Sequence, residues 1–180
     1  MRITGGRLRG RILHTVPGLT TRPTTDKVRQ SIFNVLMHDI DGARVLDIFA
    51  GSGALGIDAL SRGAVSAVFV EAGGKQVEAI KKNLKSVDLD MPVLAVDYRE
   101  AGRLLAEKEK KFDLIFADPP YEEITPRMVA EIVFRYNLLS PDGLLIIEHK
   151  SGLTAKPENM KLLKRKKYGQ TEVSFYAAKK

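Results

Sequence analysis

The chain has 180 residues, a net charge of +7 and no cysteine. A chain of this length is expected to form one domain around one core, and the missing cysteines exclude disulfide bonds and thiolate metal sites. No apolar run approaches the roughly 20 residues that span a membrane, and the three histidines show no metal-ligand spacing, so we expect a cytoplasmic monomer with neither a membrane span nor a metal ion.

Positive charge is concentrated at the two ends of the chain. Residues 1–30 hold seven arginines and lysines against one acid, and residues 156–180 hold eight against two, so the middle of the chain is acidic on balance. This distribution is typical of a protein whose ends contact a polyanion. The alternative is two solvated segments that only raise solubility, since lysines in a terminal strand also protect the edge of a sheet.

Residues 1–24 are expected to form a basic arm or hairpin that precedes the main domain, residues 25–180. Arginines alternate here with apolar residues in a loose period of two, Arg2, Arg7, Arg9 and Arg11 with Ile3, Leu8 and Ile12. This period would place the arginines on one face of the arm. A helix is then expected after Thr24 or Thr25, either of which suits the N-cap, with an apolar side formed by Val28, Ile32, Phe33 and Leu36.

From residue 43 onward the pattern alternates between strand and helix. Strands are expected at 43–48, 66–71, 92–97, 112–118 and 143–148, with a helix after each of the first four (75–87 and about 126–138 among them) and a turn at 140–143 before the fifth. Repeated units of this kind predict a parallel sheet covered on both faces. Two further strand-like runs, 160–168 and 171–178, are separated only by Gly169-Gln170, which requires an antiparallel pair.

The stretch from Asp47 to Gly56 is expected to be a ligand-binding turn between the strand at 43–48 and the helix that follows it. Its glycines fit the spacing G-x-G-x-x-G, and Glu71 lies 20 residues after the first of them, Gly51, at the end of the next strand. This is the pattern of a dinucleotide site, in which the acid binds a ribose. The same turn also serves nucleosides without a phosphate, or no ligand at all.

Asp47 favours a cationic ligand over a pyrophosphate at this turn. At a separation of about 4 Å and an effective dielectric constant near 20, two like unit charges repel by roughly 4 kcal/mol. A carboxylate at the strand tip instead attracts an ammonium or sulfonium group. S-adenosylmethionine combines such groups with a ribose for Glu71 and a carboxylate for the helix N–H groups. A dinucleotide is disfavoured by this argument but not excluded.

A second candidate motif, Asp118-Pro119-Pro120-Tyr121, follows the strand at 112–118 and is expected at the same edge of the sheet. Prolines stiffen the turn and lack N–H donors. A carboxylate and an unpaired carbonyl would each accept a hydrogen bond from an exocyclic amine, while the tyrosine ring stacks on the base that bears it. Held in this way, the amine nitrogen would attack a sulfonium methyl group, and Asp118 would help to remove its proton. The alternative is a rigid turn without catalytic function.

Taken together, these motifs resemble class I S-adenosylmethionine-dependent methyltransferases, and among them the bacterial 16S rRNA guanine-N2 methyltransferases of the RsmD family. Besides the two motifs above, the resemblance rests on Gly5-Gly6, Arg9-Gly10-Arg11, residues 22–29, Phe33-Asn34, Leu60-Ser61-Arg62 and Lys82-Asn83-Leu84. It implies a Rossmann-like α/β fold with a mostly parallel seven-stranded sheet, closed by the antiparallel C-terminal hairpin and extended by the basic N-terminal hairpin.

The resemblance also implies the site residues. The expected catalytic residues are Asp118, Pro119, Pro120 and Tyr121. S-adenosylmethionine would be bound by Arg22, Thr24, Asp47, Phe49, Ala50, Gly51, Ser52, Gly53, Glu71, Asp97 and Tyr98. The positive charge at the two ends of the chain, and not the resemblance, indicates the residues that would bind ribosomal RNA within a small-subunit particle, namely Arg7, Arg9, Arg11, Arg29, Lys164, Arg165, Lys166 and Lys167. The chain departs from the family pattern at Gly73-Gly74, beside the expected adenine contacts, and at Gln30.

Three other functions remain open on the sequence alone. An amino-group methyltransferase could act on another RNA, or on adenine or cytosine in DNA. A nucleotide-dependent oxidoreductase would use the same glycine turn. A non-catalytic RNA-binding assembly factor would keep the fold and the basic ends without using the motif at residues 118–121.

Overall fold

The computed structural model describes residues 1–16, 25–121, 123–153, 157 and 159–179. Within these ranges the helices and strands, in chain order, are α1 (Asp26–Val35), β1 (Arg44–Ile48), α2 (Ala54–Ser61), β2 (Ser66–Val70), α3 (Gly74–Ser86), β3 (Val93–Leu94), α4 (Tyr98–Glu107), β4 (Phe112–Ala117), α5 (Pro126–Arg135), β5 (Leu139–Lys150), β6 (Met160–Tyr168) and β7 (Thr171–Ala178). None of these helices is long and apolar enough to cross a membrane.

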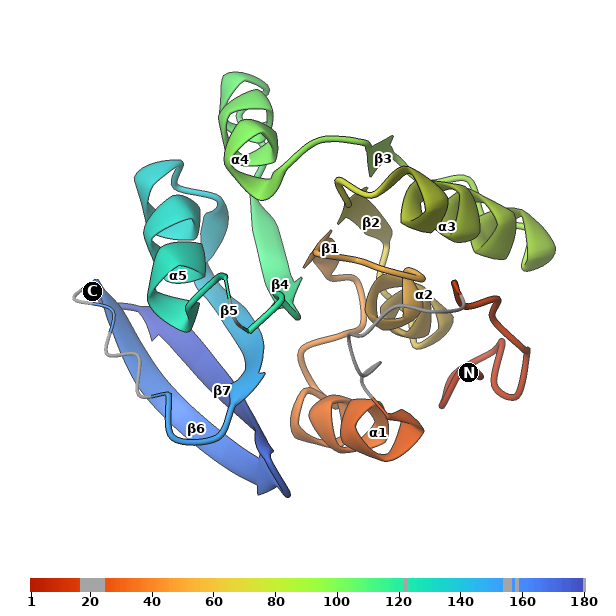
Figure 1. Ribbon diagram of the computed structural model, residues 1–180, viewed down its shortest axis with the longest axis horizontal. Coiled ribbons are helices and arrows are strands. Elements are labelled where there is room, and N and C mark those ends of the chain that lie inside the picture. Colours follow the sequence, from red (N-terminus) through yellow and green to blue (C-terminus); the bar gives the residue numbers. More distant parts are fainter. Residues whose placement is uncertain (17–24, 122, 154–156, 158, 180) are drawn as a thin grey trace.

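The strands form one seven-stranded sheet in the order β3-β2-β1-β4-β5-β7-β6 (Figure 1). The first five strands pair in parallel, and β7 pairs antiparallel with both β5 and β6. The predicted parallel sheet with a terminal antiparallel hairpin is therefore confirmed. The order reverses between β1 and β4, which is where sheets of this type bind ligands outside the carboxyl ends of their strands.

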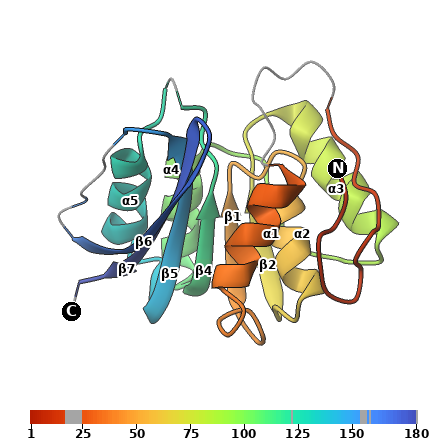
Figure 2. The same cartoon turned by 90° about the horizontal axis from the view of Figure 1, so that it is seen from below.

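Helices cover both faces of the sheet, as Figures 1 and 2 show. One core lies between the sheet and α1, α2 and α3, and the other lies between the sheet and α4 and α5. Successive strand residues alternate between the two cores because side chains of a strand point to opposite faces. In β4, for example, Leu114 and Phe116 belong to the first core, and Ile115 and Ala117 belong to the second.

Three elements differ from the sequence-based expectation. The third strand has only two residues, Val93 and Leu94, rather than six. The expected turn at 140–143 lies inside β5, where the pairing with β4 shifts register between Phe112 and Leu114, so the Pro and Gly residues form an irregularity within a longer strand. The helix expected to run to residue 138 ends at Arg135.

The basic N-terminal hairpin is not confirmed as a regular element. Residues 1–16 contain a single antiparallel bridge, between Arg2 and Ile12. Ile12 is 74% exposed, while Ile3, Leu8 and Leu13 belong to the core beside α1 and α2. The expected alternation therefore fails at Ile12, and this segment is an integral part of the domain's packing.

A buried carboxylate fastens the N-terminal segment to α2. Asp58 is fully buried and accepts hydrogen bonds from the backbone N–H groups of Thr4 and Gly5, at 3.0 and 3.2 Å. The buried Arg29 guanidinium of α1 lies 3.3 Å from the same carboxylate, and Arg62 lies 3.5 Å from it. The charge of Asp58 is thus compensated from two helices and the segment at once.

Replacing Asp58 with alanine is expected to lower the free energy of unfolding by about 3 kcal/mol, because the buried guanidinium of Arg29 loses one of its two carboxylate partners and the N–H groups of Thr4 and Gly5 lose their acceptor. Urea denaturation measures this loss. Asp113→Ala, which breaks the half-exposed pair of Asp113 with Arg44, serves as the control and should cost no more than about 1 kcal/mol. Equal losses in the two variants would contradict the anchoring role.

Candidate active site

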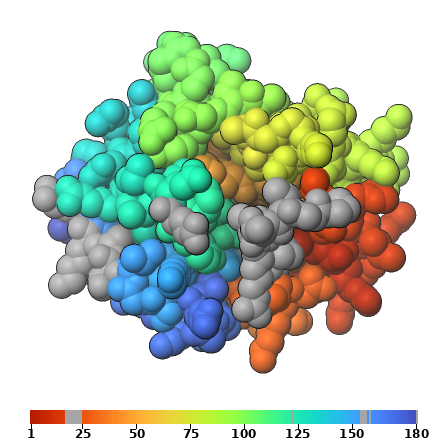
Figure 3. Space-filling view, viewed as in Figure 1, coloured from red at the N-terminus to blue at the C-terminus, as the bar shows by residue number. Residues whose placement is uncertain are grey.

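The two sequence motifs meet at the carboxyl edge of the sheet. Ile48 of β1 pairs with Ala117 of β4, so the turn after β1 and the motif that begins at Asp118 leave adjacent strands side by side. Figure 3 looks onto this edge and shows the turn after β1, in brown-orange, recessed between the yellow-green start of α3 and the teal segment after β4. The geometric requirement of the sequence-based hypothesis, both motifs at one edge, is confirmed.

The turn after β1 holds a backbone conformation that favours glycine. Gly51 and Gly53 have φ values of 57° and 76°, and Phe49 also has a positive φ of 62°, which is uncommon for a residue with a side chain. Gly53 is the N-cap of α2 and makes no side-chain capping bond. The turn therefore presents the N-terminal end of a helix, where N–H groups and the helix dipole favour an anionic group.

Asp47 lies beneath this turn and supports it from below. Its carboxylate is 2% exposed and accepts a hydrogen bond of 2.9 Å from the N–H of Gly56. A Cβ atom on Gly56 would lie 2.4 Å from the ring of Phe69, so only glycine lets α2 approach the sheet this closely. The sequence-based hypothesis placed Asp47 against the ligand; its burial instead indicates a role in shaping the turn.

Burial raises the pKa of Asp47 to about 7, the N–H of Gly56 opposes this rise, and the charge of Glu71 adds to it. Near neutral pH the carboxyl group is therefore partly protonated. The electrostatic argument against a pyrophosphate assumed a full negative charge on Asp47, and it is correspondingly weaker in this structure.

Glu71 links the turn to the loop after β2. Its two carboxylate oxygens accept hydrogen bonds of 2.9 Å from the N–H groups of Gly51 and Gly73. Since each oxygen carries a second lone pair, the side chain retains the capacity to accept hydroxyl groups of a ribose. The departure from the family pattern at Gly73 thus preserves a backbone contact to this acid.

The ring of Tyr98, at the start of α4, packs against Phe49 with the centroids 5.1 Å apart. Asp97 caps α4 by accepting hydrogen bonds from the N–H groups of Arg99 and Glu100, at 2.8 and 3.0 Å. The buried tyrosine and the half-exposed Phe49 therefore form an aromatic wall beside the glycine turn. A wall of this kind suits the planar ring of an adenine.

The loop after β4 is stiffened and joined to β5. The carbonyl of Pro120 accepts hydrogen bonds of 3.1 Å from the N–H groups of Glu123 and Ile124, which closes a tight turn. The hydroxyl of Tyr121 donates a hydrogen bond of 3.0 Å to Glu148. Burial, with the nearby charges of Asp118 and Glu148, raises the pKa of Tyr121 far above its usual range, so this hydroxyl keeps its proton.

Glu148 is a site residue that sequence reasoning missed. Ala117 pairs with Ile147, so Asp118 and Glu148 are the next residues on adjacent strands, and Glu148 is only 6% exposed. Burial of a carboxylate without a hydrogen-bond partner costs free energy. The partner of Glu148 is the hydroxyl of Tyr121, which belongs to the motif at residues 118–121. The available signal was an acid at the end of the apolar run Leu144-Leu145-Ile146-Ile147.

The predicted RNA-binding residues fall into three groups. Exposed side chains are found on the N-terminal segment (Arg7, Arg9, Arg11) and on the edge strand β6 (Lys164, Arg165, Lys167, with Lys166 partly buried), and α1 lies between these two elements in Figures 1 and 2. Arg29 requires correction, because its guanidinium is fully buried and paired with Asp26 and Asp58. Arg22 and Thr24, which are predicted to bind S-adenosylmethionine and not RNA, lie outside the described residues.

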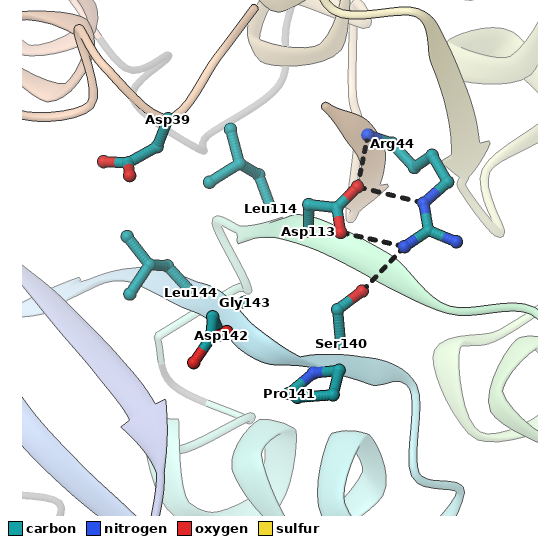
Figure 4. Close-up of a pocket in the computed structure, with 9 residues that line it drawn as sticks. All are labelled: Asp39, Arg44, Asp113, Leu114, Ser140, Pro141, Asp142, Gly143 and Leu144. Atoms are coloured by element: carbon teal, nitrogen blue, oxygen red, sulfur yellow. Dashed lines mark hydrogen bonds and ion pairs between the residues drawn. The ribbon is translucent and has the colours of Figure 1, made fainter. Parts of the chain in front are cut away.

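A separate cavity of about 390 Å³ lies at the amino edge of the sheet, near the irregularity in β5. Figure 4 shows one polar cluster in its lining, in which the guanidinium of Arg44 is bonded to both oxygens of Asp113 at 2.9 Å and to Ser140 at 3.0 Å. These groups satisfy one another, so they offer little to a ligand. Within the described residues, His, Asp and Glu side chains form no group of three that could hold a metal ion.

Comparisons with known proteins agree with this architecture. The family described as Conserved hypothetical protein 95 matches residues 1–177. The chain is 40% identical to YlbH of Bacillus subtilis, with 98% of each covered. It is 35% identical to Ribosomal RNA small subunit methyltransferase D of Escherichia coli, with 98% of this chain and 89% of that protein covered. The solved structure of yhhF from Escherichia coli has a TM-score of 0.86 at 35% identity and covers 99% of this chain and 98% of its own.

The raised pKa of Asp47 predicts a specific pH dependence of stability. The native carboxyl titrates near pH 7, against a usual value of 3.8. Between pH 3.8 and about 7 the native state therefore binds more protons than the unfolded state. The stabilisation due to protonated Asp47 is lost as the pH rises through 7. The difference in free energy of unfolding between the wild type and Asp47→Asn should shift against the wild type from pH 5 to pH 8. Urea denaturation at several pH values measures it, and a constant difference would contradict the assignment.

Proposed function

The chain belongs to the RsmD family, matched as Conserved hypothetical protein 95, and on this basis we propose that it transfers a methyl group from S-adenosylmethionine to the N2 amine of a guanine in 16S ribosomal RNA. The observation that carries the proposal is the junction of two motifs at one sheet edge, a nucleoside-type glycine turn beside Asp118-Pro119-Pro120-Tyr121. The relative in Escherichia coli is named for methylation of small-subunit ribosomal RNA, which supports this class of substrate.

The residues at the glycine turn fit S-adenosylmethionine. Glu71 would accept the ribose hydroxyls, the Phe49–Tyr98 wall would contact the adenine, and the backbone from Ala50 to Gly53 would follow the methionine part. The uncapped start of α2 suits its carboxylate. Four further residues are proposed to contact S-adenosylmethionine, namely Asp97, Ser52, Arg22 and Thr24. Asp47 would contribute by holding the shape of the glycine turn.

The loop after β4 would hold the target base. Bound S-adenosylmethionine supplies an electrophilic methyl group on a sulfonium sulfur. Asp118 and the Pro119 carbonyl would accept hydrogen bonds from the two amine hydrogens, which directs the nitrogen lone pair toward the cofactor side of the edge. As the nitrogen bonds to the methyl carbon, the sulfur–methyl bond breaks and S-adenosylhomocysteine is left as the product, while Asp118 accepts the proton that the nitrogen loses. Tyr121, held by Glu148, would stack on the base, which must be unpaired or flipped out to reach this position.

The RNA would lie across the side of the molecule that carries α1. The exposed arginines at residues 7–11 and the basic run at residues 164–167 flank this helix, and such spaced cations would contact separate stretches of phosphate backbone. A folded ribosomal RNA, within a small-subunit particle in the cytoplasm, offers phosphates in this arrangement. Because the guanidinium of Arg29 is buried, it has no part in the proposed surface.

The test of the proposed function is transfer of a labelled methyl group from S-adenosylmethionine to 16S rRNA. Asp118→Ala should lower kcat by about 10²- to 10⁴-fold, the usual range for loss of a positioned acid–base group, while S-adenosylhomocysteine still binds. Asp113→Ala is the control, because Asp113 lies at the opposite end of β4 and pairs with Arg44, and it should leave kcat unchanged.

Three outcomes of this assay would contradict the proposal. Activity unchanged in Asp118→Ala would remove this residue from the chemistry. Label transfer to duplex DNA but not to rRNA would favour an amino-group DNA methyltransferase. Binding of rRNA without any transfer in single-turnover conditions would favour an assembly factor.

The contact between Tyr121 and Glu148 gives a second prediction. Tyr121→Phe keeps the ring but loses the hydroxyl that donates to Glu148, so the ring is no longer fixed in place. The KM for rRNA should rise about three- to tenfold, in line with the usual worth of a hydrogen bond to a charged group, while S-adenosylhomocysteine affinity stays constant. Tyr136→Phe, at the end of α5, is the matched control. Equal KM values for Tyr121→Phe and wild type would exclude this positioning role.

A further inference from the structure

Asn83 of α3 connects two segments that are distant in the sequence. Its side chain is fully buried. Its Nδ2 donates hydrogen bonds to the carbonyls of His14 and Ser52, at 2.9 and 2.8 Å, and its Oδ1 accepts one of 2.7 Å from the N–H of His14. One amide thus uses both of its donors and one acceptor to join the N-terminal segment to the glycine turn.

At one end of this connection lies the most adaptable part of the cofactor turn. Ser52 stands between two glycines in the left-handed region, Gly51 and Gly53. The carbonyl of Ser52 shares a rigid peptide plane with the N–H of Gly53. This N–H donates a hydrogen bond of 2.7 Å to the carbonyl of Ala50. The hydrogen bond from Asn83 fixes the orientation of that plane, and without it the glycines would leave the turn several accessible conformations.

At the other end lies a segment that is itself firmly held. His14 belongs to the N-terminal segment, whose residues Thr4 and Gly5 are bonded to Asp58 and whose Leu8 is bonded to Ser61. A second contact between segment and turn runs from the Ser52 hydroxyl to the sulfur of Met1, at 3.5 Å. The turn is therefore braced against a part of the chain outside the βα units.

Only an amide satisfies all of these partners. An aspartate would have no donor for the carbonyls of His14 and Ser52. A leucine of similar size would take one hydrogen-bond partner from each of three partly buried backbone groups. The amide pairs with both backbone groups of His14, as a neighbouring strand residue would, and still has one donor for the turn.

We propose that Asn83 is a positioning residue for the cofactor, which holds the Ser52–Gly53 peptide plane in its binding orientation by bracing it against His14. The inference rests on the proposed function, because it concerns affinity for S-adenosylmethionine. It extends the site beyond the residues that contact the ligand, to α3 and to the backbone at residue 14.

Calorimetric titration of the full chain with S-adenosylhomocysteine tests the proposal. Asn83→Leu should raise the dissociation constant about tenfold or more, the equivalent of one lost buried hydrogen bond. The control for a general loss of stability is Ser174→Ala in β7. It removes a buried hydroxyl that lies 2.8 Å from Nε2 of His149, and it should leave the dissociation constant unchanged. In turnover with saturating rRNA, Asn83→Leu should raise the KM for S-adenosylmethionine while kcat stays near that of the wild type.

A pair of variants at His14 keeps the test decisive if Asn83→Leu does not fold. His14→Pro removes the N–H that donates to Asn83, whereas His14→Ala retains it and changes only an exposed side chain. The proline variant should bind S-adenosylhomocysteine several-fold more weakly, and the alanine variant should match the wild type.

Equal affinity in the folded Asn83 and His14 variants and the wild type would overturn the inference, as would an equal loss in Ser174→Ala. A wild type that binds no S-adenosylhomocysteine would instead contradict the cofactor assignment in the proposed function, and the inference would fall with it.

Discussion

The register between β1 and β4 is the constraint on which the site depends. Asp47 pairs with Phe116, and Ile48 pairs with Ala117, so the chain leaves both strands at the same height. A shift of one residue would turn every β4 side chain to the opposite face of the sheet. Leu114 and Phe116 would then leave the core under α1 and α2, and Asp118 would leave the face it shares with Glu148. The packing of two cores therefore also fixes the relative position of the glycine turn after β1 and the motif after β4.

Irregular backbone at the site is held by buried polar side chains. A turn with three residues at positive φ leaves N–H and carbonyl groups without regular partners. Asp47, Glu71 and Asn83 supply those partners at Gly56, Gly51 and Ser52 in turn. Each comes from a different element, namely β1, the end of β2 and α3, so the turn takes its shape only when all three are assembled. In this arrangement, side chains on rigid elements fix the backbone of the glycine turn, as the support of a preorganised site does.

The sequence predicted the fold well because its periodic patterns are strong. Runs such as Val68-Phe69-Val70 and the separation of β6 from β7 by Gly169-Gln170 leave few alternatives, and both motifs lie where the pattern placed them. Long-range polar contacts were not predictable. The buried Arg29 differs from the exposed Arg9 through its pairing with Asp58, which lies on another helix and 29 residues away. In the same way, Glu148 and Asn83 acquire their roles from partners 27 and 69 residues away.

The brace at Asn83 also sets an order of events during synthesis of the chain. The backbone of His14 has no partner until Asn83 has been synthesised, and Thr4 has none until Asp58 has been synthesised. The hydrogen bonds that join the glycine turn to the N-terminal segment therefore cannot form on a nascent chain that ends before residue 83. At usual translation rates the interval is on the order of ten seconds. Completion of α3 is thus the step that allows the N-terminal segment and the glycine turn to be joined through Asn83.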